Sequence, residues 1–260
     1  MKPLRALPCM LAMLASDVAA QAPDTVVLLH GLGRTSASMA RIARALRHEG
    51  YDVVNVSYPS RHQPIETLAT EWLPAQLRAA AQAPAPAVAI ARPPDPTRTA
   101  APAAAVPRVH FVTHSMGGIV VRLWLRECGA PANLGRVVML APPNAGSELS
   151  DRLRSNVFFR WFMGRNGRRL GTGADSLPRT LGPWPATSSD LGIIAGDRPL
   201  TPLMASWLPA PSDGKVTVAA THLAGERDHV VLHYSHTWIG WRRETIAQMI
   251  AFLRDGRFAR

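Results

Sequence analysis

The chain has 260 residues, 47% of them hydrophobic, which suffices for one domain of ordinary α/β size with a sizeable core. Its formal net charge is +11, but the basic residues are scattered arginines apart from Lys2 and Lys215. Scattered charge excludes a nucleic-acid-binding class, which needs a basic patch or stripe. Of the two cysteines, Cys9 falls in a predicted leader and Cys128 is expected to pack near a helix end, so disulfides have little scope.

The N-terminus has the pattern of a secretory signal peptide over residues 1–22. Lys2 and Arg5 precede an apolar run that reaches Ala15, and small residues follow. The run is too short to span a membrane as a helix. We therefore predict a protein that is secreted or periplasmic, with 23–260 as its single domain. The alternative is an apolar N-terminus that frays from a cytoplasmic protein.

Apolar strands alternate with helical stretches along the rest of the chain. Strands are predicted at 26–29, 52–56, 109–113, 136–141 and 191–195. Helices are predicted at 36–48, 64–81, 116–128 and 242–253. This alternation is typical of the α/β class, with a mostly parallel sheet and helices on both faces.

Two segments interrupt the alternation. Residues 83–107 are mostly Ala and Pro, which favours a polyproline or disordered surface insertion, either an inert linker or a partner-docking segment. Residues 150–190 lack strand periodicity, and we predict an insertion there. Within it, 160–169 interleaves arginines with Trp161 and other apolar side chains. That cluster predicts either transient contact with an anionic membrane surface or a solvated loop.

A serine lies at the predicted strand-to-helix turn Thr113-His114-Ser115-Met116-Gly117. The pattern matches G-x-S-x-G except that Thr113 replaces the first glycine. In such a turn the strained backbone lifts the serine hydroxyl clear of the sheet, and small neighbours are needed where chains approach closely. The bulk of Thr113 weakens the match, and a surface serine at a helix N-cap is the plain alternative.

This segment resembles the nucleophile elbow of the α/β-hydrolase superfamily, in its bacterial lipase and esterase branch. A strand ending in His30-Gly31 lies upstream, as in that fold, and 141–148 is similar to the Pro-(His/Asn)-x-Gly-Ser stretch of that group. The resemblance implies an α/β-hydrolase fold with a short cap at 150–190. It also implies an oxyanion hole made by the backbone N–H groups of Leu32 and Met116.

In the α/β-hydrolase fold the nucleophile is followed along the chain by an acid and then by a histidine. His236 stands just before the final predicted helix, where the fold has its catalytic histidine, so we favour it over His233 and His229. Asp213 lies in an Asp-Gly-Lys-Val segment similar to the one that carries the acid in secreted bacterial lipases.

Two other aspartates remain candidates for the acid. Asp197 follows a predicted strand and ranks second, and Asp228 ranks third; each is also a plain turn residue in the alternative reading. Those lipases bind calcium through an aspartate close behind the catalytic histidine, but Thr237 and Trp238 stand there in this chain. We therefore expect no metal site, and no motif calls for a cofactor.

The sequence thus predicts a serine hydrolase that cleaves carboxylic esters, lipid-like or with short acyl groups, through Ser115, His236 and Asp213. Apolar residues of 158–163 and Trp184 are expected to line an acyl pocket. Two alternatives stay open. One is an acyltransferase or thioesterase that uses the same residues, and the other is a catalytically silent relative that binds lipid or a partner protein.

Overall fold

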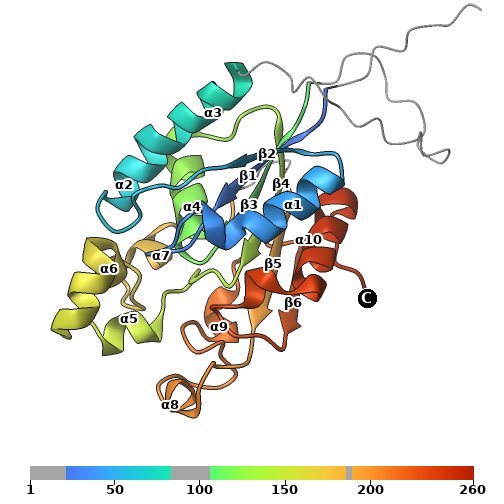
Figure 1. Cartoon of the computed structure of the whole chain (residues 1–260). Coiled ribbons are helices and arrows are strands. Elements are labelled where there is room, and N and C mark those ends of the chain that lie inside the picture. Colours follow the sequence, from blue (N-terminus) through green and yellow to red (C-terminus); the bar gives the residue numbers. More distant parts are fainter. Residues whose placement is uncertain (1–21, 83–105, 186–188) are drawn as a thin grey trace, which may run out of the picture.

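The computed structural model describes residues 22–82, 106–185 and 189–260 (Figure 1). The predicted signal peptide and the Ala/Pro-rich insertion fall almost entirely outside the described residues. Where the structure does describe the chain, none of its helices combines the length and the apolar character that crossing a membrane requires.

The described residues are built around a sheet of six parallel strands in the order β2-β1-β3-β4-β5-β6. The strands are β1 (Thr25–Leu29), β2 (Asp52–Asn55), β3 (Val109–His114), β4 (Leu134–Leu140), β5 (Leu191–Gly196) and β6 (Asp228–Leu232). β1, β3, β4 and β5 are almost fully buried, because helices cover both faces of a parallel sheet. The predicted fold class is confirmed, although β6 was not among the predicted strands.

Helices cover both faces of the sheet (Figure 1). One face packs against α1 (Ala40–His48) and α10 (Arg243–Asp255), and the other against α2 (Ile65–Thr67), the π-helical turn η2 (Leu68–Trp72), α3 (Leu73–Gln82) and α4 (Met116–Cys128). The remaining helices are η1 (Ser36–Met39), α5 (Glu148–Arg152), α6 (Val157–Arg169), α7 (Leu177–Thr180), α8 (Pro202–Ala205), α9 (Val218–Thr221) and η3 (Ile239–Trp241).

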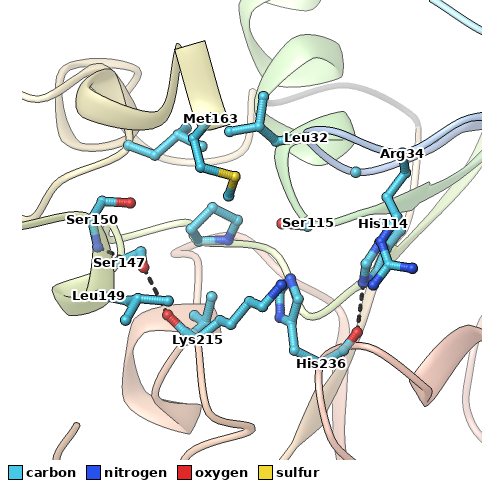
Figure 2. A pocket seen from close by; sticks show the side chains of 14 residues that line it. Leu32, Arg34, His114, Ser115, Ser147, Leu149, Ser150, Met163, Lys215 and His236 are labelled. Atoms are coloured by element: carbon cyan, nitrogen blue, oxygen red, sulfur yellow. Dashed lines mark hydrogen bonds between the residues drawn. The ribbon is translucent and has the colours of Figure 1, made fainter. Parts of the chain in front are cut away.

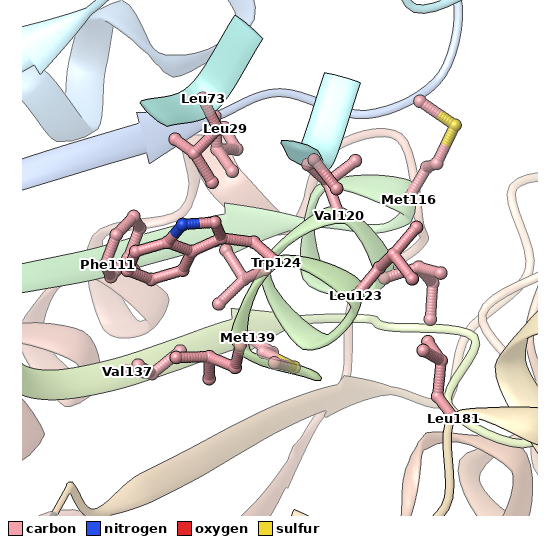
Figure 3. Close-up of a cluster of buried hydrophobic side chains, with 14 of the residues drawn as sticks. Leu29, Leu73, Phe111, Met116, Val120, Leu123, Trp124, Val137, Met139 and Leu181 are labelled. Atoms are coloured by element: carbon pink, nitrogen blue, oxygen red, sulfur yellow. The ribbon is translucent and has the colours of Figure 1, made fainter. Parts of the chain in front are cut away.

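The alternation of side chains along the strands divides the core into two layers. On β1, Val27 and Leu29 join the layer beneath α4, whereas Val26 and Leu28 join the layer beneath α1 and α10. Figure 3 shows the α4 layer, in which the rings of Phe111 and Trp124 lie 5.3 Å apart between centroids. Both layers bury large apolar side chains completely, so the sheet is a rigid support for the loops at its ends.

Three local predictions need correction. The helix predicted from residue 36 starts as the 3₁₀ turn η1, in which the Ser38 hydroxyl donates to the carbonyl of Thr35 instead of capping α1. The helix predicted at 64–81 contains the π-helical turn η2. Cys128 is exposed and not packed, because it falls on the last turn of α4, where 126–128 are all exposed before Gly129 (φ 78°) ends the helix.

Arg122 on α4 ties together the connections that follow β4. Its buried guanidinium donates to the carbonyl oxygens of Asn144 (3.0 Å), Pro178 (2.9 Å) and Gly182 (2.7 Å). Burial lowers the Arg122 pKa to about 10, so the group stays cationic at neutral pH and can serve several carbonyls at once. The arginine thereby holds α7 and the loop after β4 against α4.

We predict that Arg122→Met lowers the free energy of unfolding by about 3 kcal/mol, because it leaves buried carbonyls without donors. Urea denaturation followed by circular dichroism measures the change. The matched control is Arg44→Met, at an exposed position of α1, for which we expect a change within about 0.5 kcal/mol. Equal stability of the two variants would refute the role given to Arg122.

Candidate active site

Ser115 occupies a strained backbone conformation between β3 and α4. Its φ of 53° and ψ of −123° lie where a side chain-bearing residue is rarely found, at a cost of about 1–3 kcal/mol. Two hydrogen bonds support it: its N–H donates to the carbonyl of Leu140 (2.8 Å), and its carbonyl accepts from Gly118 N–H (3.0 Å). The segment is therefore an elbow and not an ordinary N-cap.

The glycines after Ser115 allow this elbow to pack. A Cβ on Gly117 would lie 2.6 Å from the carbonyl oxygen of Leu29, so no other residue fits without moving β1. A Cβ on Gly118 would lie 3.3 Å from the hydroxyl oxygen of Thr113. The bulk of Thr113, which weakened the sequence match, is accommodated because Gly118 has no side chain there.

His236 and Asp213 form a buried pair. His236 Nδ1 lies 2.7 Å from Asp213 Oδ2, and the residues are 5% and 2% exposed. The other carboxylate oxygen accepts from the backbone N–H groups of Lys215 (2.9 Å) and Val216 (2.8 Å), which holds the carboxylate in place. Because a carboxylate only accepts, Nδ1 of His236 is the donor, and in the neutral ring with this tautomer Nε2 has a lone pair that can take a proton.

The structure brings Ser115 and His236 into the lining of one open pocket (Figure 2). Leu32 lines the pocket too. Met116 is the first residue of α4, so its backbone N–H has no hydrogen-bond acceptor within the helix. The predicted site residues therefore come together from the loops after β1, β3, β5 and β6. These loops meet at the carboxyl edge of the sheet, where ligand sites of open α/β sheets lie.

The other candidates for acid and base are engaged elsewhere. Asp197 Oδ2 lies 2.8 Å from Nδ1 of His233, whose side chain is 73% exposed, and neither residue lines the pocket with Ser115. Asp228 accepts from the N–H groups of His229 and Phe258. Thus Asp197, the second-ranked acid, pairs with His233, one of the two alternative bases, and not with the serine.

Of the residues that were expected to form an acyl pocket, some line the pocket beside Ser115 and others do not. Met163 lines the pocket, but Trp184 is buried in the core, where its indole N–H donates to the carbonyl of Ser189. Phe158 and Trp161 are 81% and 74% exposed, so they face away from the core. The expectation for Trp184 was wrong, since its place in the α4 layer is set by long-range packing.

Two histidines that carried no predicted role position the site. The N–H of Tyr58 donates to His30 Nε2 (3.1 Å), so Nδ1 is protonated and donates to the carbonyl of Gly31 (2.9 Å). His114 Nε2 lies 3.0 Å from the carbonyl of His236 and must donate to it. Burial, with the neighbouring His236 a smaller cause, holds the pKa of His114 well below its usual range.

Among the residues that the structure describes, no three His, Cys, Asp or Glu side chains gather in a way that could hold a metal ion. The expectation that the protein needs no metal stays a prediction.

Comparisons with known proteins agree with this architecture. A family model described as alpha/beta hydrolase family matches residues 26–257. The fold is similar to mature Bacillus licheniformis lipase BlEst2, with a TM-score of 0.63 and 20% identity over 90% of this chain and 92% of the lipase. It is also similar to the metagenomic carboxyl esterase MGS0156, with a TM-score of 0.57 and 19% identity over 85% of this chain and 66% of that one.

A third similar structure is the type II thioesterase BorB from the borrelidin biosynthetic cluster, with a TM-score of 0.50 and 18% identity over 90% of this chain and 92% of BorB. No curated protein matches the chain. At such identities the structural likenesses show the fold alone.

We predict that the protein loses stability as the pH falls from 7.5 to 5. Burial lowers the pKa of His30, and it lowers the pKa of His229 to about 4. As the pH falls below about 6.5, the unfolded chain therefore binds protons at these histidines that the folded chain does not bind. The contribution of these two histidines to the free energy of unfolding is fully present above about pH 6.5 and is lost as the pH falls toward their pKa values in the folded protein. Urea midpoints at the two pH values measure the loss.

The loss should be smaller in His229→Gln, because that variant removes one of the groups with a lowered pKa. It should be unchanged in His62→Gln, at an exposed position. A wild-type midpoint that rises on acidification would contradict the linkage.

Proposed function

Since the chain belongs to the alpha/beta hydrolase family, we propose that it is a serine hydrolase of carboxylic esters. Ser115 is the nucleophile, His236 the general base and Asp213 the residue that orients the base. The observation that carries the proposal is the buried His236–Asp213 hydrogen bond beside a pocket that also contains the strained Ser115. Similarity in fold to a lipase and a carboxyl esterase supports the choice of ester.

The reaction proceeds in two steps. In the first, the Ser115 hydroxyl attacks the ester carbonyl carbon, His236 Nε2 takes its proton, and the alcohol leaves with that proton. In the second, water attacks the acyl-enzyme, again with His236 as base, and the acid is released as the Ser115 hydroxyl re-forms. The N–H groups of Leu32 and Met116 stabilise the oxyanion in both steps, and each donor is worth roughly 2.7–4 kcal/mol.

The pocket suits a lipid-like or short acyl chain. Leu149, Met163 and Leu170 line it and offer apolar contacts to an acyl group. We assign 23–260 to one catalytic domain, with 150–190 as a cap beside the site; Figure 1 shows α5, α6 and α7 together at one end of the molecule. The exposed Val157, Phe158 and Trp161 on α6 support transient contact with a membrane surface, and we propose a secreted or periplasmic location.

A fluorophosphonate probe tests whether Ser115 is an activated nucleophile. We expect covalent labelling of the wild-type protein and none of Ser115→Ala, because the probe reacts only with a serine whose proton a neighbouring base accepts. The measurement is the mass of the intact protein. A folded wild-type protein that stays unlabelled would favour the alternative of a silent binding protein.

The assignment of the acid is tested with matched substitutions. Asp213→Asn should lower kcat for a p-nitrophenyl ester about a thousandfold, since an amide favours the wrong His236 tautomer. Asp197→Asn should change kcat less than about threefold, because Asp197 contacts His233 outside the pocket. The opposite ranking would refute Asp213 as the acid. Acyl transfer to added alcohols or thioester cleavage that exceeds ester hydrolysis would favour a transferase or thioesterase.

A further inference from the structure

The pocket beside Ser115 contains two cationic side chains that the reaction does not use. Arg34 comes from the loop after β1, and Lys215 lies two residues after Asp213. Both line the pocket, and Figure 2 shows the Lys215 side chain extending toward His236. The two cations approach the reaction centre from different loops.

Neither cation has a partner of its own. Across 22–82, 106–185 and 189–260, the side chains of Arg34 and Lys215 make no hydrogen bond or ion pair, and no acidic residue lines the pocket. Asp213 attracts Lys215 electrostatically, but its oxygens already accept from His236 and from two backbone N–H groups. Neither cation therefore has an ion-pair partner among the described residues.

The arrangement is costly for the protein alone. Burial, and then the charge of Arg34, lowers the pKa of Lys215, which means that its ammonium form is disfavoured where it stands. The hydrogen bonds that Lys215 makes within the fold come from its backbone and not from its ammonium group. Its N–H donates to Asp213 and its carbonyl accepts from Ser147 Oγ (2.7 Å). A bound anion would remove the cost.

We propose that the substrate is an ester bearing an anionic oxygen group, a carboxylate or a phosphate, which Lys215 and Arg34 bind while its carbonyl lies at Ser115. The inference rests on the proposed ester hydrolysis and specifies its substrate class. An apolar flank at Leu149, Met163 and Leu170 faces the same space, so the substrate combines an apolar part with a charged part. Charge-assisted hydrogen bonds to such a group are stronger than neutral ones.

Paired substrates that differ only in the anion test this selectivity. One pair is mono-p-nitrophenyl glutarate and p-nitrophenyl pentanoate, which places a carboxylate on the acyl side. The other is 1-octanoylglycerol 3-phosphate and 1-octanoylglycerol, which places a phosphate on the alcohol side. For the wild-type enzyme we expect kcat/KM to favour the anionic member of one pair about tenfold, and less at high ionic strength.

The variants Lys215→Met and Arg34→Met should each lower that ratio about tenfold, whereas Arg44→Met, which removes an equal charge outside the pocket, should leave it unchanged. Circular dichroism and a urea midpoint establish that each variant folds. The two substituted residues lie on separate loops, so if one variant does not fold, the other still tests the proposal. A preference in the first pair identifies an acyl-side carboxylate, and one in the second an alcohol-side phosphate. No preference in either pair, or a ratio that both pocket variants leave unchanged, overturns the proposal.

Calorimetry separates this inference from the proposed function. Glutarate and inorganic phosphate are titrated into Ser115→Ala, which cannot turn over, and into the same protein carrying Lys215→Met. Binding of either anion that is lost with Lys215→Met supports the site even if no ester is cleaved. Absence of binding of both anions counts against it even if neutral esters are cleaved.

Discussion

The site depends on one constraint, the strained backbone of Ser115 at the end of β3. A residue with φ near 53° persists only where its surroundings hold it, and here β4 accepts its N–H while β1 lies against Gly117. The close approach is possible because Gly117 and Gly118 have no side chains. Rigid packing of the core beneath β1 and β3 therefore determines where the serine hydroxyl lies.

Neutral imidazoles position the rest of the site. His30 holds the loop that contains Leu32 by accepting at one ring nitrogen and donating at the other, which only the neutral ring can do. His114 donates to the carbonyl of His236 and so supports that residue from behind. Burial disfavours protonation of both rings, so the geometry around Ser115 is maintained at neutral pH.

The charged side chains of the site differ in whether other groups of the protein pair with them. Asp213 is fully engaged by His236 and two backbone donors, whereas the side chains of Arg34 and Lys215 make no ion pair within the described residues. In contrast, the buried Arg122 has four acceptor contacts on the loops that follow β4. The difference separates an arginine that stabilises the fold from two cations that are available to a ligand.

The sequence by itself determined the α/β class and the strand-to-helix turn at Ser115, because hydrophobic periodicity and turn composition are local properties. The order in which acid and base follow the serine was implied by the resemblance to the α/β-hydrolase superfamily. The choice of His236 over His233 and of Asp213 over Asp197 rested on the resemblance. Only the tertiary structure shows that Asp213 is hydrogen-bonded to His236 and Asp197 to His233. The assignment of catalytic roles stays a prediction. Tertiary contacts also decided that Thr113 fits against Gly118, that Trp184 belongs to the core and that Lys215 faces the pocket, since each depends on segments far apart in the chain.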